Sequence, residues 1–206
     1  MRVFTILGPS QSGKTTLAWA LAGLDGAMGK RQETAAVAAM QPFSFMAEDW
    51  AAIDIAGGAE NLAQAGPALA ASDAAVLCVP ADAEAAVLAA PFLRTLEEAG
   101  IPVILFINRI DQARGRVADI VAALQTYANH SIILRQVPFR EKGKIVGAVD
   151  LISERAWKYI AGQPSALIEL PQEMLGPMIL QSGFCSARIS FPHCWARRNT
   201  AMVFCA

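Results

Sequence analysis

The sequence predicts a doubly wound α/β fold, with a mostly parallel sheet and helices on both faces. Apolar runs of strand length alternate along the chain with longer segments of helical character. Most of these runs lack polar alternation, which is typical of parallel strands that are covered on both faces. Hydrophobic residues make up 54% of the 206 residues and charged residues 17%, so the chain can bury a sizeable core. The length fits one domain of ordinary size, or one such domain plus an appendage.

The expected elements follow in order along the chain. Val3–Leu7 is the first apolar run, and after a glycine-rich turn the segment Lys14–Ala22 is predicted to be helical. Further strands are predicted at Trp50–Ile55, Ala74–Val79, Val103–Ile107 and Ile132–Val137, and further helices at Glu60–Ala71, Ala83–Ala99 and Arg116–Ala128. Strands that alternate with helices in this way are the pattern of the doubly wound sheet.

Two segments depart from the alternation and are predicted hairpins. Phe43–Met46 is followed by the short turn Ala47-Glu48-Asp49 and then by the strand that begins at Trp50, which indicates an antiparallel pair at the sheet edge. Within Ile132–Asp150, the charged turn REKGK separates two strand-like runs. This second hairpin is predicted to lie on a small subdomain.

Composition and charge exclude several classes of function. The net charge of −1 argues against a surface that generally coats nucleic acid, and no sequence-specific nucleic-acid partner is expected. No run of 18 uninterrupted apolar residues is present, so no membrane span is predicted. The apolar start of MRVFTILGPS is too short for the core of a signal peptide. Of the four cysteines, only Cys78 lies in the first 184 residues, which favours a reducing, cytoplasmic setting.

The pattern fails from about Leu175 onward. Residues 176–206 contain three cysteines and no acidic residue. They are interpreted as a basic, thiol-rich interaction tail, as a metal site, or as sequence that was never selected to fold with the rest, as a shifted reading frame would produce. The spacing of Cys185, His193 and Cys194 matches no paired-ligand pattern, which disfavours zinc. We expect a divergent, poorly ordered tail.

Residues 8 to 15 read GPSQSGKT and satisfy the phosphate-loop motif G-x-x-x-x-G-K-[ST] in full. The motif follows a predicted strand and opens a predicted helix, which is the context that it requires. Gly8 and Gly13 let the backbone curl so that its N–H groups point at a polyphosphate. Lys14 places a positive charge on the terminal phosphates, and the Thr15 hydroxyl can bind Mg²⁺.

Residues 54 to 58 read DIAGG, in which an aspartate is followed after two residues by two glycines that carry no side chain. Asp54 ends a predicted strand and is a candidate Walker-B carboxylate that holds Mg²⁺ through water. The glycine at Gly57 lets a backbone N–H approach a terminal phosphate with no side chain between them. The segment therefore predicts a turn that senses the phosphate.

The base is indicated by NRID at residues 108 to 111, at the end of a predicted strand. The Asp111 carboxylate can accept hydrogen bonds from N1–H and the exocyclic amine of guanine, groups that adenine does not offer there. Asn108 can tie the base to the phosphate loop, and the Arg109 stem can lie across the ring. In this position after a phosphate loop, the motif favours GTP over ATP.

With these motifs in place, residues 1 to 175 resemble the G domain of the translational GTPases, most closely that of elongation factor G and its paralogues. The resemblance rests on GPSQSGKTTL, AAIDIAGG, SDAAVLCVPADAE, GIPVILFINRID and QVPFREKGKIVGAVDLISERAWKY. It implies a P-loop NTPase fold of the G-domain type with the start of a small inserted subdomain, with GTP or GDP and Mg²⁺ as cofactors. It implies a role in protein biosynthesis, with the ribosome as a partner. The residues assigned to the nucleotide are Gly8, Pro9, Ser10, Gln11, Ser12, Gly13, Lys14, Thr15, Thr16, Gly57, Asn108, Arg109 and Asp111, and those assigned to the metal are Thr15 and Asp54.

The chain departs from the family in ways that bear on hydrolysis. Gly58 stands where the family carries its catalytic histidine, so slow or absent GTP hydrolysis is expected. QETAAV stands roughly where the family has R-G-I-T, and Thr34 is about one residue out of register. The Ser-Ala pair of the fifth nucleotide motif is absent from these residues. We expect a GTP-binding core at residues 1–130, the start of the insertion at 131–175 and the tail at 176–206. The alternatives are a P-loop small-molecule kinase or ATPase and a non-catalytic truncated fragment.

Overall fold

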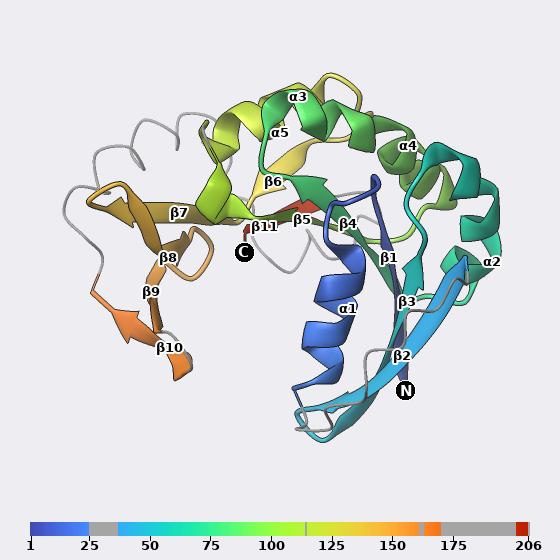
Figure 1. The fold of residues 1–206 in the computed structure, drawn as a ribbon, viewed down its shortest axis with the longest axis horizontal. Helices are drawn as coiled ribbons and strands as arrows, with labels where there is room; N and C mark the ends of the chain where they lie inside the picture. Colours follow the sequence, from blue (N-terminus) through green and yellow to red (C-terminus); the bar gives the residue numbers. More distant parts are fainter. Residues whose placement is uncertain (25–36, 114, 161–162, 170–200, 206) are drawn as a thin grey trace.

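The computed structural model contains a central sheet of seven strands in the order β2-β3-β1-β4-β5-β11-β6 (Figure 1). The structure describes residues 1–24, 37–113, 115–160, 163–169 and 201–205. Neighbouring strands are parallel except β2 and β3, which confirms the predicted fold class. The strands are β1 Arg2–Leu7, β2 Ala38–Phe45, β3 Glu48–Ile55, β4 Ala74–Pro80, β5 Val103–Asn108, β6 Ile132–Leu134 and β11 Ala201–Cys205.

Helices cover both faces of this sheet (Figure 1). On one face, α1 (Lys14–Ala22) buries Ala18 against Ile6, Ala52 and Cys78. On the other face lies the larger core, in which Leu77 and Leu105 pack against Leu93, Leu96 and Leu124 of the helices. The helical segments beyond α1 are η1 Ala59–Gln64, α2 Ala65–Ala70, α3 Ala83–Ala86, η2 Val87–Ala89, α4 Ala90–Ala99, η3 Ile110–Gln112 and α5 Val117–Gln125.

Two predicted helices are interrupted. The segment Ala83–Ala99 is not one helix, because it divides into α3, η2 and α4. Pro91 lies at the start of α4, where its missing N–H costs nothing, and in the middle of a longer helix it would remove a backbone hydrogen bond. The segment predicted from Glu60 begins as the 3-10 helix η1 and becomes α-helical only at Ala65.

The edge hairpin is present, but its turn is displaced from the predicted position. The turn consists of Met46 and Ala47, with φ of 53° and 61°. Glu48 and Asp49 were assigned to the turn and are instead the first residues of β3, opposite Phe45 and Ser44. A two-residue turn in which both residues have positive φ matches the right-handed twist of the two strands. The chain therefore turns over two residues and not over a longer polar segment.

A second sheet of four antiparallel strands, in the order β10-β9-β8-β7, follows β6 in the chain. It contains the predicted hairpin, which turns at Lys142 and Gly143. The strand predicted at Ile132–Val137 is wrong as a single element, because Arg135 separates β6 in the main sheet from β7 in the small one. Arg135 Nε donates to Asp150 Oδ2 at 3.0 Å, which fixes this crossing between the sheets. The bounds are β7 Gln136–Glu141, β8 Lys144–Asp150, β9 Arg155–Ile160 and β10 Gln163–Ile168.

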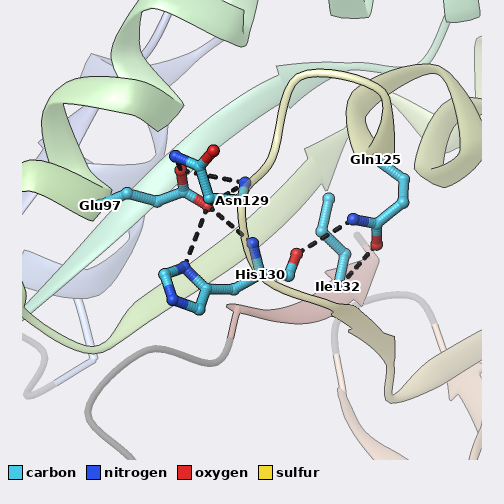
Figure 2. Close-up of polar contacts among 5 residues, drawn as sticks. All are labelled: Glu97, Gln125, Asn129, His130 and Ile132. Atoms are coloured by element: carbon cyan, nitrogen blue, oxygen red, sulfur yellow. Dashed lines mark hydrogen bonds and ion pairs between the residues drawn. The ribbon is translucent and has the colours of Figure 1, made fainter.

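A buried carboxylate anchors the connection from α5 to β6 (Figure 2). The Glu97 side chain is 11% exposed and accepts from the backbone N–H groups of Asn129 and His130 and from the Asn129 amide. On the other side of the loop, the Gln125 amide bonds His130 O and Ile132 N. The two side chains supply the hydrogen bonds that this irregular backbone cannot make within a helix or a strand.

The tail contributes an inner strand to the main sheet, between β5 and the edge strand β6. β11 pairs in parallel with β5 on one side and with β6 on the other. Its first residue, Ala201, lies opposite Val103 of β5 and Ile132 of β6. We expected all of residues 176–206 to be poorly ordered, and these five residues were not predicted as a strand. Residues 176–200 lie outside the described part of the chain. Within that part, no helix is long and apolar enough to cross a membrane.

Candidate functional site

The phosphate loop joins β1 to α1 at the carboxyl edge of the main sheet, where β3, β4 and β5 also end. This edge is where open α/β sheets bind ligands. Gly8 has φ of 144° and Gly13 has φ of 90°. A Cβ at Gly8 would collide with the carbonyl of Cys78, and a Cβ at Gly13 would collide with the Asn108 amide. The curled loop therefore requires glycine at both positions.

Lys14, Thr15 and Asp54 form the charged centre of the site. Lys14 is 5% exposed, and its Nζ donates to Pro9 O at 2.7 Å. Thr15 Oγ1 donates to Asp54 Oδ2 at 2.6 Å. Burial lowers the pKa of Lys14, although the Asp54 charge opposes that shift. Burial also raises the pKa of Asp54, against the Thr15 hydrogen bond and the Lys14 charge.

Asp54 retains an acceptor that no neighbour uses. The residue is 8% exposed, and Oδ1 has no hydrogen-bond partner among the described residues. A buried carboxylate oxygen without a partner costs free energy unless a ligand binds it. With the Thr15 hydroxyl beside it, this is an oxygen-donor set that suits Mg²⁺.

The DIAGG turn lies directly against the phosphate loop. A Cβ at Gly57 would be 2.6 Å from Ser10 Cα, 2.7 Å from Lys14 Nζ and 2.8 Å from Ser10 N. No side chain fits there, which is the bare backbone that the sequence predicted. The Asn61 amide donates to Gly57 O at 3.0 Å and holds the turn in this orientation.

The base motif is tied to the phosphate loop by a single side chain. Asn108 Nδ2 donates to Ser12 O at 3.0 Å, and Asn108 Oδ1 accepts from Arg109 N at 2.8 Å. This second bond holds Arg109 in the left-handed region, with φ of 58°. Asp111 follows in η3 and is exposed at the same edge.

A pocket of about 210 Å³ lies between the two motifs. It is lined by Gln11, Ser12, Pro80, Ala81, Asp82, Asn108, Arg109 and Gln112. Sequence reasoning missed Asp82 and Gln112. Asp82 caps α3 by accepting a hydrogen bond from Ala85 N at 3.2 Å. An aspartate that follows a predicted strand and begins a helix was therefore the sequence signal that could have placed Asp82 at this edge.

The structure brings most of the predicted residues to one edge of the sheet, but some lie apart. Thr16 is exposed on α1, one residue beyond the Thr15–Asp54 pair. Thr34 lies outside the described residues. Among the described residues, no group of three or more His, Cys, Asp or Glu side chains is placed to hold a metal ion.

Comparisons with known proteins agree on one family. The model of the family described as elongation factor Tu GTP binding domain matches residues 38–190, a range that begins at β2. The phosphate loop lies before this range and is identified from its motif and its geometry. The elongation factor G-like protein of Synechocystis sp. is 27% identical over 195 residues, which cover 85% of this chain and 29% of that protein. The mitochondrial elongation factor G of Drosophila grimshawi is 32% identical over 84 residues, which cover 39% of this chain and 11% of that protein.

The fold has a counterpart among solved structures. A crystal structure of a protein from Thermus thermophilus superposes on this chain with a TM-score of 0.79 and 22% identity. The match covers 100% of this chain and 37% of that one. The chain thus spans less than half the length of these relatives.

Proposed function

Because the chain belongs to the elongation factor Tu GTP-binding domain family, and is a translational GTPase G domain of the elongation-factor-G-like type, we propose that the edge described above is its guanine-nucleotide site. The observation that carries the proposal is the hydrogen bond from Asn108 Nδ2 to Ser12 O at 3.0 Å. It joins the phosphate loop to the base motif across 96 residues of sequence. A loop that binds phosphate and a motif that reads a base are thereby held in one site.

The polyphosphate end of the nucleotide is bound by the phosphate loop. The curled backbone supplies N–H donors, and the start of α1 adds a positive electrostatic potential. Lys14 exchanges its bond to Pro9 O for one to a terminal phosphate, since a buried ammonium gains more from an anion than from a carbonyl. Bound Mg²⁺ would neutralise phosphate charge, and the residues that would hold it are Thr15 and Asp54.

The base is selected by Asp111. Its carboxylate accepts two hydrogen bonds from guanine, whereas adenine would leave it unpaired at a cost of about 1–3 kcal/mol. That cost corresponds to a preference of roughly 10- to 100-fold. Arg109, held in the left-handed region by Asn108, lines the pocket, and its stem would lie across the base.

Hydrolysis is proposed to be slow in the isolated chain. Gly58 has no side chain to orient water, and its φ of 114° is a conformation that residues with a side chain rarely adopt. Positioning and electrostatics supply most of the catalysis in phosphoryl transfer. The nucleotide is therefore expected to remain bound as GTP for much longer than it takes to bind.

The wider role is proposed from the relatives. The two relatives are named as an elongation factor G-like protein and an elongation factor G, so we propose protein biosynthesis as the role and the ribosome as the partner of this chain. We propose a cytoplasmic location from the cysteine usage of the first 175 residues. We also propose a division into a GTP-binding core at residues 1–130, an insertion from 131 to 175 and a tail at 176–206, although β6 and β11 lie outside residues 1–130 and pair within the main sheet of that core. The four-stranded sheet that lies between β6 and β11 in the chain supports the insertion.

Competition binding tests the proposal. Fluorescent GDP is displaced from the purified chain by GDP, GTP, ADP and ATP, with and without Mg²⁺. We expect guanine nucleotides to compete at least 10-fold better than adenine nucleotides, and Lys14→Ala to abolish binding. Equal competition by ATP would instead support the alternative of a P-loop kinase or ATPase. The absence of binding by any of the four would support the non-catalytic fragment.

A further inference from the structure

The space beside Gly58 is occupied by the carboxylate of Glu60. A Cβ built at Gly58 would collide with Oε1, Cδ and Oε2 of Glu60. Glu60 lies in the first turn of η1, and its carboxylate has no hydrogen bond or ion pair among the described residues. A free acceptor thus lies where a side chain from position 58 would begin.

This position is next to the groups that would hold the terminal phosphate. Gly57 packs on Lys14 Nζ and Ser10 N, and Gly58 is one residue further along the turn. A phosphate bound to Nζ, followed by the water that attacks it, spans about 6 to 7 Å from the ammonium. The Glu60 carboxylate contacts Gly58, which is one residue from the Gly57 backbone that lies against Lys14 Nζ.

Two other polar side chains near the turn are already assigned. The Asn61 amide nitrogen donates to Gly57 O. Asp54 accepts from Thr15 through Oδ2, and its Oδ1, which has no hydrogen-bond partner among the described residues, is the oxygen proposed for Mg²⁺. Glu60 is exposed, so its carboxylate can turn from Gly58 toward a bound phosphate without breaking a hydrogen bond. With Asp54 assigned to the metal, the Glu60 carboxylate is an acceptor of the turn that is available for a water molecule.

We propose that Glu60 is the catalytic residue that orients and deprotonates the attacking water, an inference that rests on GTP binding at this site. The water oxygen bonds to the terminal phosphorus while the bond from that phosphorus to the bridging oxygen breaks. GDP leaves with the electron pair of that bond. The water proton passes to a Glu60 carboxylate oxygen and from there to the released phosphate. A general base in this position raises the rate by roughly 10²- to 10⁴-fold.

Single-turnover hydrolysis of GTP by the full chain with Mg²⁺ tests the assignment. Glu60→Gln is expected to lower the rate on the order of 10²-fold. Its affinity for GTP should remain within about twofold, because the carboxylate contacts water rather than the nucleotide. Glu84→Gln is the matched control, since Glu84 is also an exposed acidic residue in the first turn of a short helix. It should leave the rate unchanged.

Chemical rescue separates catalysis from a structural role. Formate added to Glu60→Ala should restore part of the lost rate, because a small carboxylate can enter the space that the side chain vacates. A wild-type rate in Glu60→Gln, no detectable turnover of bound GTP by the unmodified chain, or no rescue by formate would overturn the assignment while leaving the nucleotide site intact. Failure of the chain to bind GTP at all would overturn the proposed function instead.

Discussion

Replacement of Asp54 by asparagine should stabilise the nucleotide-free protein at neutral pH and weaken Mg²⁺-dependent binding. Asp54 is 8% exposed, and its Oδ1 has no hydrogen-bond partner among the described residues. Burial raises its pKa, against the opposing hydrogen bond from Thr15 and the charge of Lys14. Because burial is the largest of these effects, the ionised carboxylate costs the folded state free energy that asparagine would not.

The size of the gain follows from these contacts. A buried polar atom without a partner costs about 1–3 kcal/mol. Asparagine keeps an oxygen for Thr15 but places an amide nitrogen at the position of Oδ1, so only the part due to charge is recovered. We expect a gain on the order of 1 kcal/mol, which shifts the melting temperature of a chain of this size by about 2–4 °C.

The effect depends on pH in a defined direction. The pKa of Asp54 is higher in the folded state than in the unfolded state, so the folded state binds the proton more readily. The wild type therefore loses stability as pH rises through the raised pKa, and the advantage of the variant grows over the same range. Below the pKa of the unfolded state, where both forms are neutral, that advantage disappears.

Thermal melting of both proteins in EDTA, from about pH 3 to pH 8, measures the difference. Mg²⁺ and saturating GDP should then reverse the order of the two melting temperatures, because ligand that binds the folded state stabilises the protein that binds it more tightly. A variant that melts below the wild type at pH 7 in EDTA, or a difference that does not change with pH, would refute the reasoning.

Three further predictions concern other parts of the fold. Glu97→Ala removes the acceptor for Asn129 and His130 and should lower the free energy of unfolding by about 2–3 kcal/mol, measured by urea denaturation. The control Glu98→Ala, at an exposed neighbouring residue, should change that free energy by less than about 0.5 kcal/mol. Equal losses in the two variants would contradict the role of the Glu97 hydrogen bonds. Asp111→Asn should shift the preference from GDP to xanthosine diphosphate in competition binding, because the amide presents a donor where the carboxylate accepted, and retained guanine preference would remove Asp111 from the base site. Deletion of residues 176–206 removes β11 and should lower the melting temperature, because β5 and β6 lose their shared partner; an unchanged melt would show that β11 adds no stability.

The nucleotide motifs could be predicted from the sequence because each depends on residues close together in the chain. Within GPSQSGKT, the two glycines and the lysine determine the curl, the charge and the start of α1. Asp54 and Asn108 could be placed because both end apolar runs, and parallel strands of one sheet end at the same edge. The fold class followed from the same alternation of strands and helices.

What the sequence could not supply depends on residues that are far apart in the chain. The break at Arg135 requires Asp150 on β8, and a local pattern contains no information about that partner. β11 pairs with β5, which lies far back in the chain, so its short apolar run had no local signal to distinguish it from a tail.

The same limit applies within the site. The 3-10 geometry of η1 folds the Glu60 carboxylate back onto Gly58, a contact between residues two positions apart that the residue types alone do not specify. The sequence determined that Gly58 has no side chain. Only the tertiary structure showed that the space beside it is filled.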